Sequence, residues 1–160
     1  MPATTARWLL DRGSLTRHLQ RASDGDFRVE VVHQGWARPR RSEQQLLAIP
    51  QGQRALIREV LLRCHDQPWV FARSVLPRTT LVGRLRRLRR FGSDSLGQML
   101  FNDASMRRAD FEVALLPGQD PGLPETVRCN QVLWARRSRF SLDDRPLMVS
   151  EIFLPAFHPW

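Results

Sequence analysis

Three charged residues, Arg58, Arg73 and Glu151, fall on predicted strand faces that are otherwise apolar. In a β-strand, residues two apart project to the same side of the sheet. The apolar residues at that spacing are Leu56, Val60 and Leu62 around Arg58, Trp69, Phe71 and Val75 around Arg73, and Leu147, Val149 and Phe153 around Glu151. Burial of an unpaired charge is strongly unfavourable, so each of the three needs a partner, a ligand or a water-filled pocket.

These charges have three interpretations, and the pattern alone does not choose between them. The three groups pair with one another, or the hairpin faces are inverted and both arginines lie in water. The third interpretation is a closed pocket that contains two guanidiniums and one carboxylate. Because the planar fork of arginine matches carboxylate oxygens, that pocket would bind a small dianion, and Glu151 would meet a hydroxyl or take a proton.

The remaining reactive side chains lack the spacing of a known catalytic or metal site. The four histidines show no HxxxH spacing and no cysteine neighbour, and Cys64 and Cys129 lack metal-ligand spacing. The segment Gly92 to Gly97 follows no predicted strand and does not match a phosphate-binding loop. We therefore expect two reduced thiols, no metal site and no bound nucleotide.

The net charge of +9 would ordinarily favour a nucleic-acid partner. All 25 basic residues are arginine, however. This composition indicates a codon bias of the genome rather than a phosphate-binding face, and we predict no nucleic-acid partner. In the run Arg84–Arg90 the leucines recur at helical spacing. That spacing favours a solvated helix face over a basic helix that contacts RNA or acidic lipids.

The apolar runs are too short to cross a membrane, since a spanning helix needs about 20 apolar residues. Near the N-terminus, Asp11 and Arg12 interrupt the apolar stretch that begins at Trp8 and leave no signal-peptide core. We therefore expect a cytoplasmic protein without membrane insertion.

The elements that carry these residues predict an α+β fold, in a single domain over residues 1–160. Five or six antiparallel strands are expected, at Phe27–Val31, Ala55–Cys64, Trp69–Pro77, Phe111–Leu115, Val127–Leu142 and Pro146–Pro155. Helices are expected as two short pieces around Ser14, between Leu81 and Leu88, and from Leu96. Turns are expected at His65–Pro68 and Asp143–Arg145, and loops at Arg38–Pro50 and Leu116–Glu125. The helices are expected to pack on one face of the sheet.

Five ordered blocks of the sequence resemble the chorismate lyase family, also called chorismate pyruvate-lyases. The blocks are 57–62 (IREVLL), 67–77 (QPWVFARSVLP), 95–101 (SLGQMLF), 133–140 (LWARRSRF) and 146–155 (PLMVSEIFLP). The resemblance extends from Trp8 to the C-terminus. It implies an antiparallel sheet of about six strands, with helices and flap-like segments that close over an internal ligand pocket.

The resemblance also implies cleavage of chorismate to 4-hydroxybenzoate and pyruvate, the first committed step toward ubiquinone, with no metal or organic cofactor. In the family pattern, Arg58 holds the ring carboxylate and Glu151 lies near the ring hydroxyl. Leu15 and Leu96 match positions whose backbone amides reach that carboxylate, and Arg73 matches a second site arginine. We expect a monomer that is inhibited by its product, because the product keeps both the ring carboxylate and the hydroxyl.

A non-catalytic domain that senses a small aromatic acid is the alternative function. Chorismate lyases resemble, in fold, the effector-binding domains of some bacterial transcription regulators, which normally follow a DNA-binding helix-turn-helix domain. The residues before Trp8 are too few for such a domain, so we expect the enzyme.

Overall fold

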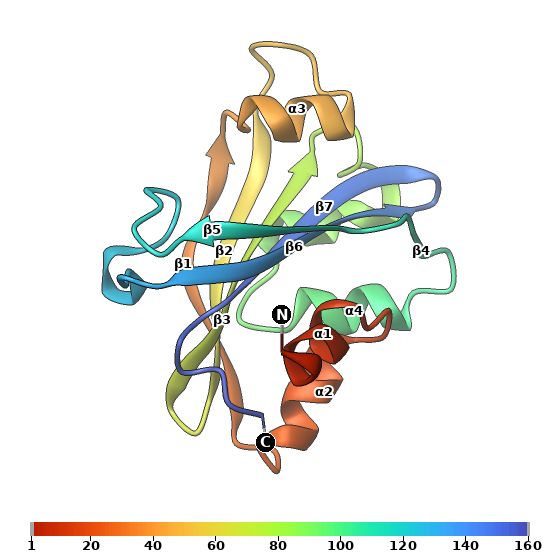
Figure 1. Ribbon diagram of the computed structural model, residues 1–160. Coiled ribbons are helices and arrows are strands. Elements are labelled where there is room, and N and C mark those ends of the chain that lie inside the picture. The colour runs from red at the N-terminus through yellow and green to blue at the C-terminus, as the bar shows by residue number, and fades with distance from the viewer. Residues whose placement is uncertain (1, 160) are drawn as a thin grey trace.

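An antiparallel sheet forms the centre of the computed structural model, which describes residues 2–159 (Figure 1). Its strands are β1 (Phe27–Ala37), β2 (Ala55–Cys64), β3 (Gln67–Pro77), β4 (Arg107–Arg108), β5 (Glu112–Pro117), β6 (Val132–Leu142) and β7 (Arg145–Phe153). The strand order is β1-β2-β3-β7-β6-β4, and β5 also pairs with β6. The α+β class and the six expected strands are confirmed, and the two-residue β4 is an addition to them.

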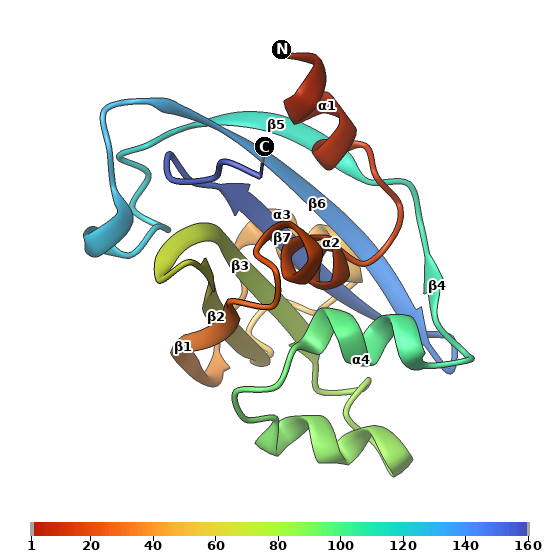
Figure 2. The same ribbon diagram turned by 90° about the horizontal axis from the view of Figure 1, so that it is seen from below.

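Helices cover both faces of the sheet. Over one face lie the helices α1 (Ala3–Leu9), α2 (Leu15–Ala22) and α4 (Leu96–Asn102) and the 3₁₀-helix η1 (Gly83–Arg90), as Figure 2 shows from below. Over the other face lie α3 (Arg41–Leu47) and the short 3₁₀-helix η2 (Glu125–Val127). The expected packing on one sheet face is confirmed for the first group, while α3 and η2 differ.

The loop expected at Arg38–Pro50 is wrong for the residues that form α3. The carboxylate of Glu43 accepts a hydrogen bond of 2.8 Å from the backbone N–H of Arg40 at the start of the helix. At its end, Leu47 is buried against the sheet. A polar segment of seven residues is too short to be helical by itself, so these tertiary contacts decide its conformation.

Both expected hairpin turns are confirmed. His65 and Asp66 have φ of 50° and 59°, and Asp143 and Asp144 have φ of 51° and 61°. Two consecutive left-handed residues are typical of the two-residue turns that fit the twist of an antiparallel hairpin. Aspartate tolerates this conformation better than most residues.

Serine side chains cap the starts of α2 and α4. The hydroxyl of Ser14 accepts from the N–H of Arg17 at 3.3 Å, and that of Ser95 accepts from the N–H of Gln98 at 3.1 Å. The hydroxyls of Thr16 and Ser95 lie 2.7 Å apart. The first turns of α2 and α4 therefore meet, although about 80 residues of chain separate them.

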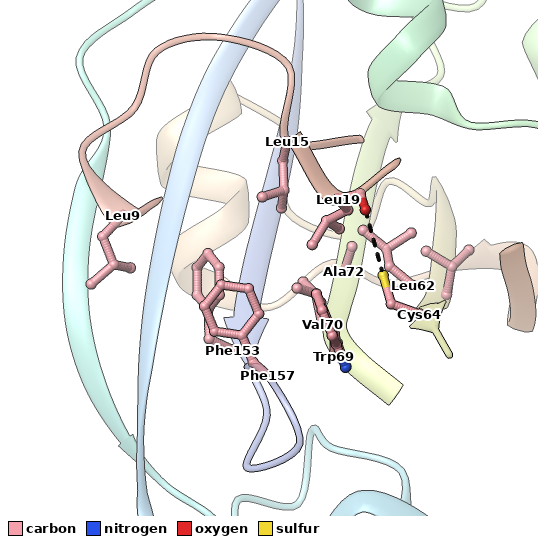
Figure 3. Packing of buried hydrophobic residues seen from close by; sticks show 11 residues of the cluster. Leu9, Leu15, Leu19, Leu62, Cys64, Trp69, Val70, Ala72, Phe153 and Phe157 are labelled. Atoms are coloured by element: carbon pink, nitrogen blue, oxygen red, sulfur yellow. Dashed lines mark hydrogen bonds between the residues drawn. The ribbon is translucent and has the colours of Figure 1, made fainter. Parts of the chain in front are cut away.

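Two segments cover one face of the sheet, residues 3–22 and residues 83–102, and we call them the covering segments. The first packs through Leu9, Leu15 and Leu19, which Figure 3 shows beside Val70, Ala72, Phe153 and Phe157. The second packs through Leu85, Leu88, Leu96 and Leu100. Together the two segments enclose a space above the middle strands. Among residues 2–159, no helix is both long and apolar enough to cross a membrane.

Candidate active site

An enclosed cavity of about 50 Å³ lies between the sheet and the two covering segments. Arg58, Glu151, Leu15 and Leu96, four of the five residues expected at the site, line it. The other lining residues are mostly apolar or small: Gly13, Thr16, Val29, Val60, Leu62, Ala72, Ser74, Ser95, Gly97, Leu100, Phe101, Arg108, Arg136, Phe140 and Val149.

Two rows of cross-strand neighbours form the floor of the cavity. The first row runs Arg58, Ser74, Val149, Ser138 across β2, β3, β7 and β6. The second row, one pleat away, runs Val60, Ala72, Glu151, Arg136. Residues opposite one another in a sheet project to the same face. The pairing therefore brings Arg58 and Glu151 to one surface, as the sequence predicted.

Arg58 is buried, and all of its hydrogen-bond partners are uncharged. Its Nη1 donates to the side-chain oxygen of Gln34 at 2.8 Å and to the carbonyl oxygens of Phe91 and Gly92 at 3.0 and 2.6 Å. Its Nη2 donates to the carbonyl oxygen of Asp94 at 2.8 Å. Burial lowers the pKa of this guanidinium, an effect that the carboxylate of Asp94 opposes. Within residues 2–159, Arg58 is thus a buried cation without an anionic hydrogen-bond partner.

Glu151 pairs with Arg136, whose Nε donates to Oε2 of the glutamate. The Nη1 of Arg136 donates to the carbonyl oxygens of Trp8, Leu9 and Asp11, at 3.1, 3.1 and 2.8 Å. Those carbonyls belong to the end of α1 and the residues after it, where helical carbonyls lack intrahelical partners. One buried arginine therefore neutralises the site carboxylate and also ties the first covering segment to the sheet.

Arg108 approaches the cavity from β4. Its Nε and Nη2 donate to the hydroxyl of Ser138 at 3.2 and 2.9 Å, and its Nη1 donates to the carbonyl of Arg12 at 3.0 Å. The guanidinium lies 5.1 Å from the ring centres of both Phe111 and Phe140. Burial lowers the pKa of Arg108 to about 10, and the nearby charge of Arg136 acts in the same direction.

The amides of Leu15 and Leu96 lie at the first helical positions of α2 and α4. The first N–H groups of a helix have no partner within it, and the cap hydroxyls already accept from Arg17 and Gln98. The two leucines therefore present amides without an intrahelical partner where the covering segments meet. This placement agrees with the backbone role that the family pattern implies.

Arg73 is not brought to the cavity. It lies on the opposite face, where its Nε and Nη2 donate to both oxygens of Glu43 at 2.8 Å and its Nη1 donates to Glu59 at 3.1 Å. Burial would raise the pKa of Glu43, but its bonds to Arg73 and to the Arg40 N–H outweigh that effect and lower it. Arg73 is thus a buried cation held between two carboxylates.

A β-bulge in the hairpin puts Arg58 and Arg73 on opposite faces. At the turn, Cys64 pairs with Gln67 and Arg63 with Pro68, a register that would set Arg58 opposite Arg73 if it continued. Between Arg63 and Leu62 the register shifts by one residue, so that Leu62 pairs with Val70. A shift of one residue reverses the face of every later side chain on that strand, so Arg58 pairs with Ser74 instead.

Two of the three interpretations of the charges are therefore wrong. Arg58, Arg73 and Glu151 do not pair with one another, and neither arginine lies in water, since Arg58 is 3% and Arg73 9% exposed. The pocket interpretation holds for Arg58 and Glu151, which line one cavity. Arg73 is not in that cavity, and Arg108 and Arg136 line it instead.

Sequence reasoning missed Arg136 and Arg108. The spacing argument used for Glu151 also applies to Arg136, which shares one face of β6 with Trp134, Ser138 and Phe140. Arg137 and Arg139 follow on the other face and obscured that signal. Arg108 lies in a two-residue strand, which is too short to show any periodicity. Among residues 2–159, no three His, Cys, Asp or Glu side chains form a group suited to a metal ion.

Comparisons with known proteins identify the family. A family described as chorismate lyase matches residues 1–159. A protein of Pseudomonas aeruginosa (strain UCBPP-PA14) named "Probable chorismate pyruvate-lyase" is 46% identical over 153 residues, which cover 96% of this chain and 84% of that protein. A protein of the same name from Methylococcus capsulatus is 46% identical over 153 residues, with 93% of each chain covered.

Solved structures with the same fold include transcriptional regulators and their domains. A transcriptional regulator of the GntR family from Bacillus cereus superposes with a TM-score of 0.60 at 14% identity, over 83% of this chain and 94% of that one. The C-terminal domain of the histidine utilization repressor from Pseudomonas syringae gives 0.59 at 12% identity, over 82% and 94%. At these identities the likeness establishes the fold alone.

Proposed function

The chain belongs to the chorismate lyase family, and from that premise we propose that it cleaves chorismate to 4-hydroxybenzoate and pyruvate, without a cofactor. The charge balance of the cavity is the observation that carries the proposal. Three guanidiniums, of Arg58, Arg108 and Arg136, and one carboxylate, of Glu151, face a cavity that is otherwise apolar or small. Two positive charges are left without a counterpart, and chorismate carries two carboxylates.

The reaction needs little from the protein beyond position and charge. The C–H bond at the hydroxyl-bearing ring carbon breaks, and its electron pair completes the aromatic ring. The neighbouring C–O bond breaks with its pair, and the enolpyruvate that leaves takes up a proton to become pyruvate. Because aromatisation makes the reaction strongly downhill, orientation of the ring and stabilisation of the departing carboxylate suffice for catalysis.

Arg58 holds the ring carboxylate together with the amides of Leu15 and Leu96 in this proposal. Glu151 lies on the next cross-strand row, two residues along β7 from Val149. It meets the ring hydroxyl or accepts the proton from the carbon that bears it. Its partner Arg136 holds the carboxylate in place in either role.

The covering segments must separate to admit the substrate. A cavity of about 150 Å³ is one that binds benzene, whereas this one measures about 50 Å³. Opening of a closed site limits the turnover of many enzymes. 4-Hydroxybenzoate keeps the contacts to Arg58 and Glu151, so in this proposal it is released slowly and inhibits the enzyme.

The cellular setting that we propose follows from the reaction. The enzyme acts in the cytoplasm and supplies 4-hydroxybenzoate to ubiquinone biosynthesis. The active unit in this proposal is a monomer.

The experiment is to mix the purified protein with chorismate and follow 4-hydroxybenzoate by absorbance, together with its effect on melting temperature. We expect turnover, inhibition by added 4-hydroxybenzoate and a thermal shift, since ligand at 100 times its Kd stabilises a protein by about 2.7 kcal/mol. A thermal shift without turnover would instead identify a sensor of small aromatic acids. If millimolar 4-hydroxybenzoate produced neither inhibition nor a thermal shift, the proposed site would be excluded.

A further inference from the structure

We propose that Arg108 binds the carboxylate of the enolpyruvyl group, and so recognises the part of chorismate that leaves. The inference rests on the proposed function and deepens it. The family pattern offers Arg73 as the second site arginine, but Arg73 is on the other face of the sheet and contacts two carboxylates. The carboxylate that leaves with pyruvate therefore needs a different cation.

Charge balance selects Arg108 among the arginines of the cavity. Arg136 is neutralised by Glu151, and Arg58 is assigned to the ring carboxylate. The side-chain hydrogen bonds of Arg108 go to a hydroxyl and a carbonyl oxygen, both uncharged. A guanidinium has five N–H donors, so these three bonds leave two donors for a ligand. Two donors match the two oxygens of a carboxylate.

Position supports the same choice. Ser138, which accepts from Arg108, is the last member of the row that begins with Arg58. Four neighbouring strands span three spacings of about 4.8 Å, so Ser138, which holds the guanidinium of Arg108, lies roughly 14 Å from Arg58 along the row. Ser74 and Val149 lie between them. Chorismate has one carboxylate on its ring and a second on the enolpyruvyl ether, so once the covering segments open it can reach from Arg58 to Arg108 across this floor. Glu151 lies beside the middle of the row.

Arg108 is also held rigidly enough to recognise a substrate group. Phe111 and Phe140 both lie 5.1 Å from its guanidinium, while the carbonyl of Arg12 fixes one Nη atom. Arg12 precedes Gly13, which lines the cavity in the first covering segment. The arginine therefore stands where that segment meets the sheet, and its charged form gains when a carboxylate enters beside it.

Substrate and product then differ in a single charged contact. Chorismate engages both Arg58 and Arg108, whereas 4-hydroxybenzoate retains only the contact to Arg58. Loss of Arg108 is expected to weaken ligands with the second carboxylate and to spare the product. Loss of Arg58 is expected to weaken both.

The test compares two ligands in binding measurements that need no turnover. The first is 4-hydroxybenzoate, and the second is 3-(carboxymethoxy)-4-hydroxybenzoate, a product analogue with an ether-linked carboxylate on the neighbouring ring carbon. In Arg108→Ala we expect the affinity for the dicarboxylate to fall about 10- to 100-fold, the range for a lost charge-assisted hydrogen bond. In the same variant, the affinity for 4-hydroxybenzoate should stay within about threefold of the wild-type value. In the matched control Arg107→Ala, both affinities should stay within about threefold, since Arg107 is exposed on the same strand.

Chorismate kinetics provide a second readout, in which kcat/KM should fall with the dicarboxylate affinity in Arg108→Ala. If the alanine variant fails to fold, Arg108→Lys serves the same comparison, with about a tenfold loss for the dicarboxylate alone because the planar fork is gone. Equal losses for both ligands, or no loss for the dicarboxylate, would overturn the assignment. If the wild-type protein does not turn over chorismate but the dicarboxylate still depends on Arg108, the enzyme proposal fails and the binding role of Arg108 stands.

Discussion

On one face of the sheet, Arg73 is buried between the carboxylates of Glu43 and Glu59. On the other face, Arg58 is buried and Arg108 is half-buried, and their side-chain hydrogen-bond partners within residues 2–159 are all uncharged. The residue type is the same, but the charge balance is not. A buried cation whose charge is already neutralised within the protein stabilises the fold. A cation that has no anionic partner within the protein can bind an anionic group of a ligand.

The largest effect on stability is expected where the charges already balance. Arg73→Ala leaves the buried Glu43 without its ion-pair partner, and loss of one partner of a buried pair costs about 3–5 kcal/mol. Urea unfolding should show this loss, while the protein that remains folded keeps its affinity for 4-hydroxybenzoate. If Arg73→Ala had normal stability but reduced turnover, the structural role of Arg73 would be contradicted, and the residue would instead be needed for catalysis.

The pH dependence of stability gives a control for that variant. The folded-state pKa of Glu43 lies below the ordinary value of 4.5, so its stabilising contribution is fully present above that value. The contribution is lost as the pH falls through the folded-state pKa. In Glu43→Gln, the decline of unfolding free energy with acid should be shallower than in the wild type.

On the cavity face, Glu151→Gln is expected to have the largest effect on turnover. Removal of a general base typically costs at least about 100-fold in rate. The variant keeps the shape of the side chain, so a pH–rate profile separates the two roles. If the carboxylate accepts the ring proton, the acidic limb of the kcat profile disappears with it. Unchanged turnover at all pH values would make Glu151 a partner of Arg136 and nothing more.

Arg58→Ala is expected to lower kcat/KM for chorismate and the affinity for 4-hydroxybenzoate together, each by about 10- to 100-fold. Arg58→Lys should recover little, because lysine cannot reproduce the planar fork. Circular dichroism and melting temperature check that the fold survives. Turnover near that of the wild type in the alanine variant would remove Arg58 from the site.

The smallest effect is expected on the exposed side of η1. Arg86 and Arg87 are exposed and form no ion pair in the structure, whereas Arg89 stacks on Trp36. Changing both exposed residues to glutamine should leave turnover within about threefold, since surface substitutions usually cost less than about 0.5 kcal/mol. A larger loss that is reversed by salt would show that this face steers the dianionic substrate to the cavity.

The sequence by itself determined the features that depend on neighbours along the chain. Period-two spacing placed Arg58 and Glu151 on apolar faces, and the sequence marked helix starts at Ser14 and near Leu96. Leu15 and Leu96, the first residues of those helices, line the cavity. The aspartates at Asp143 and Asp144 marked a hairpin turn. Such signals are local because a turn, a cap or a strand alternation involves only a few consecutive residues.

Only the tertiary structure decided which charges meet. The register shift between Leu62 and Arg63 places Arg73 on the opposite face of the sheet from Arg58. The alternation of residues along either strand cannot reveal that shift. Helix α3 exists because Glu43 and Leu47 find partners on the sheet, and Arg108 reaches the site from a strand of two residues. A buried charge is stabilised by groups that are distant in sequence, so its role is set by pairing and packing across strands rather than by the residues beside it in the chain.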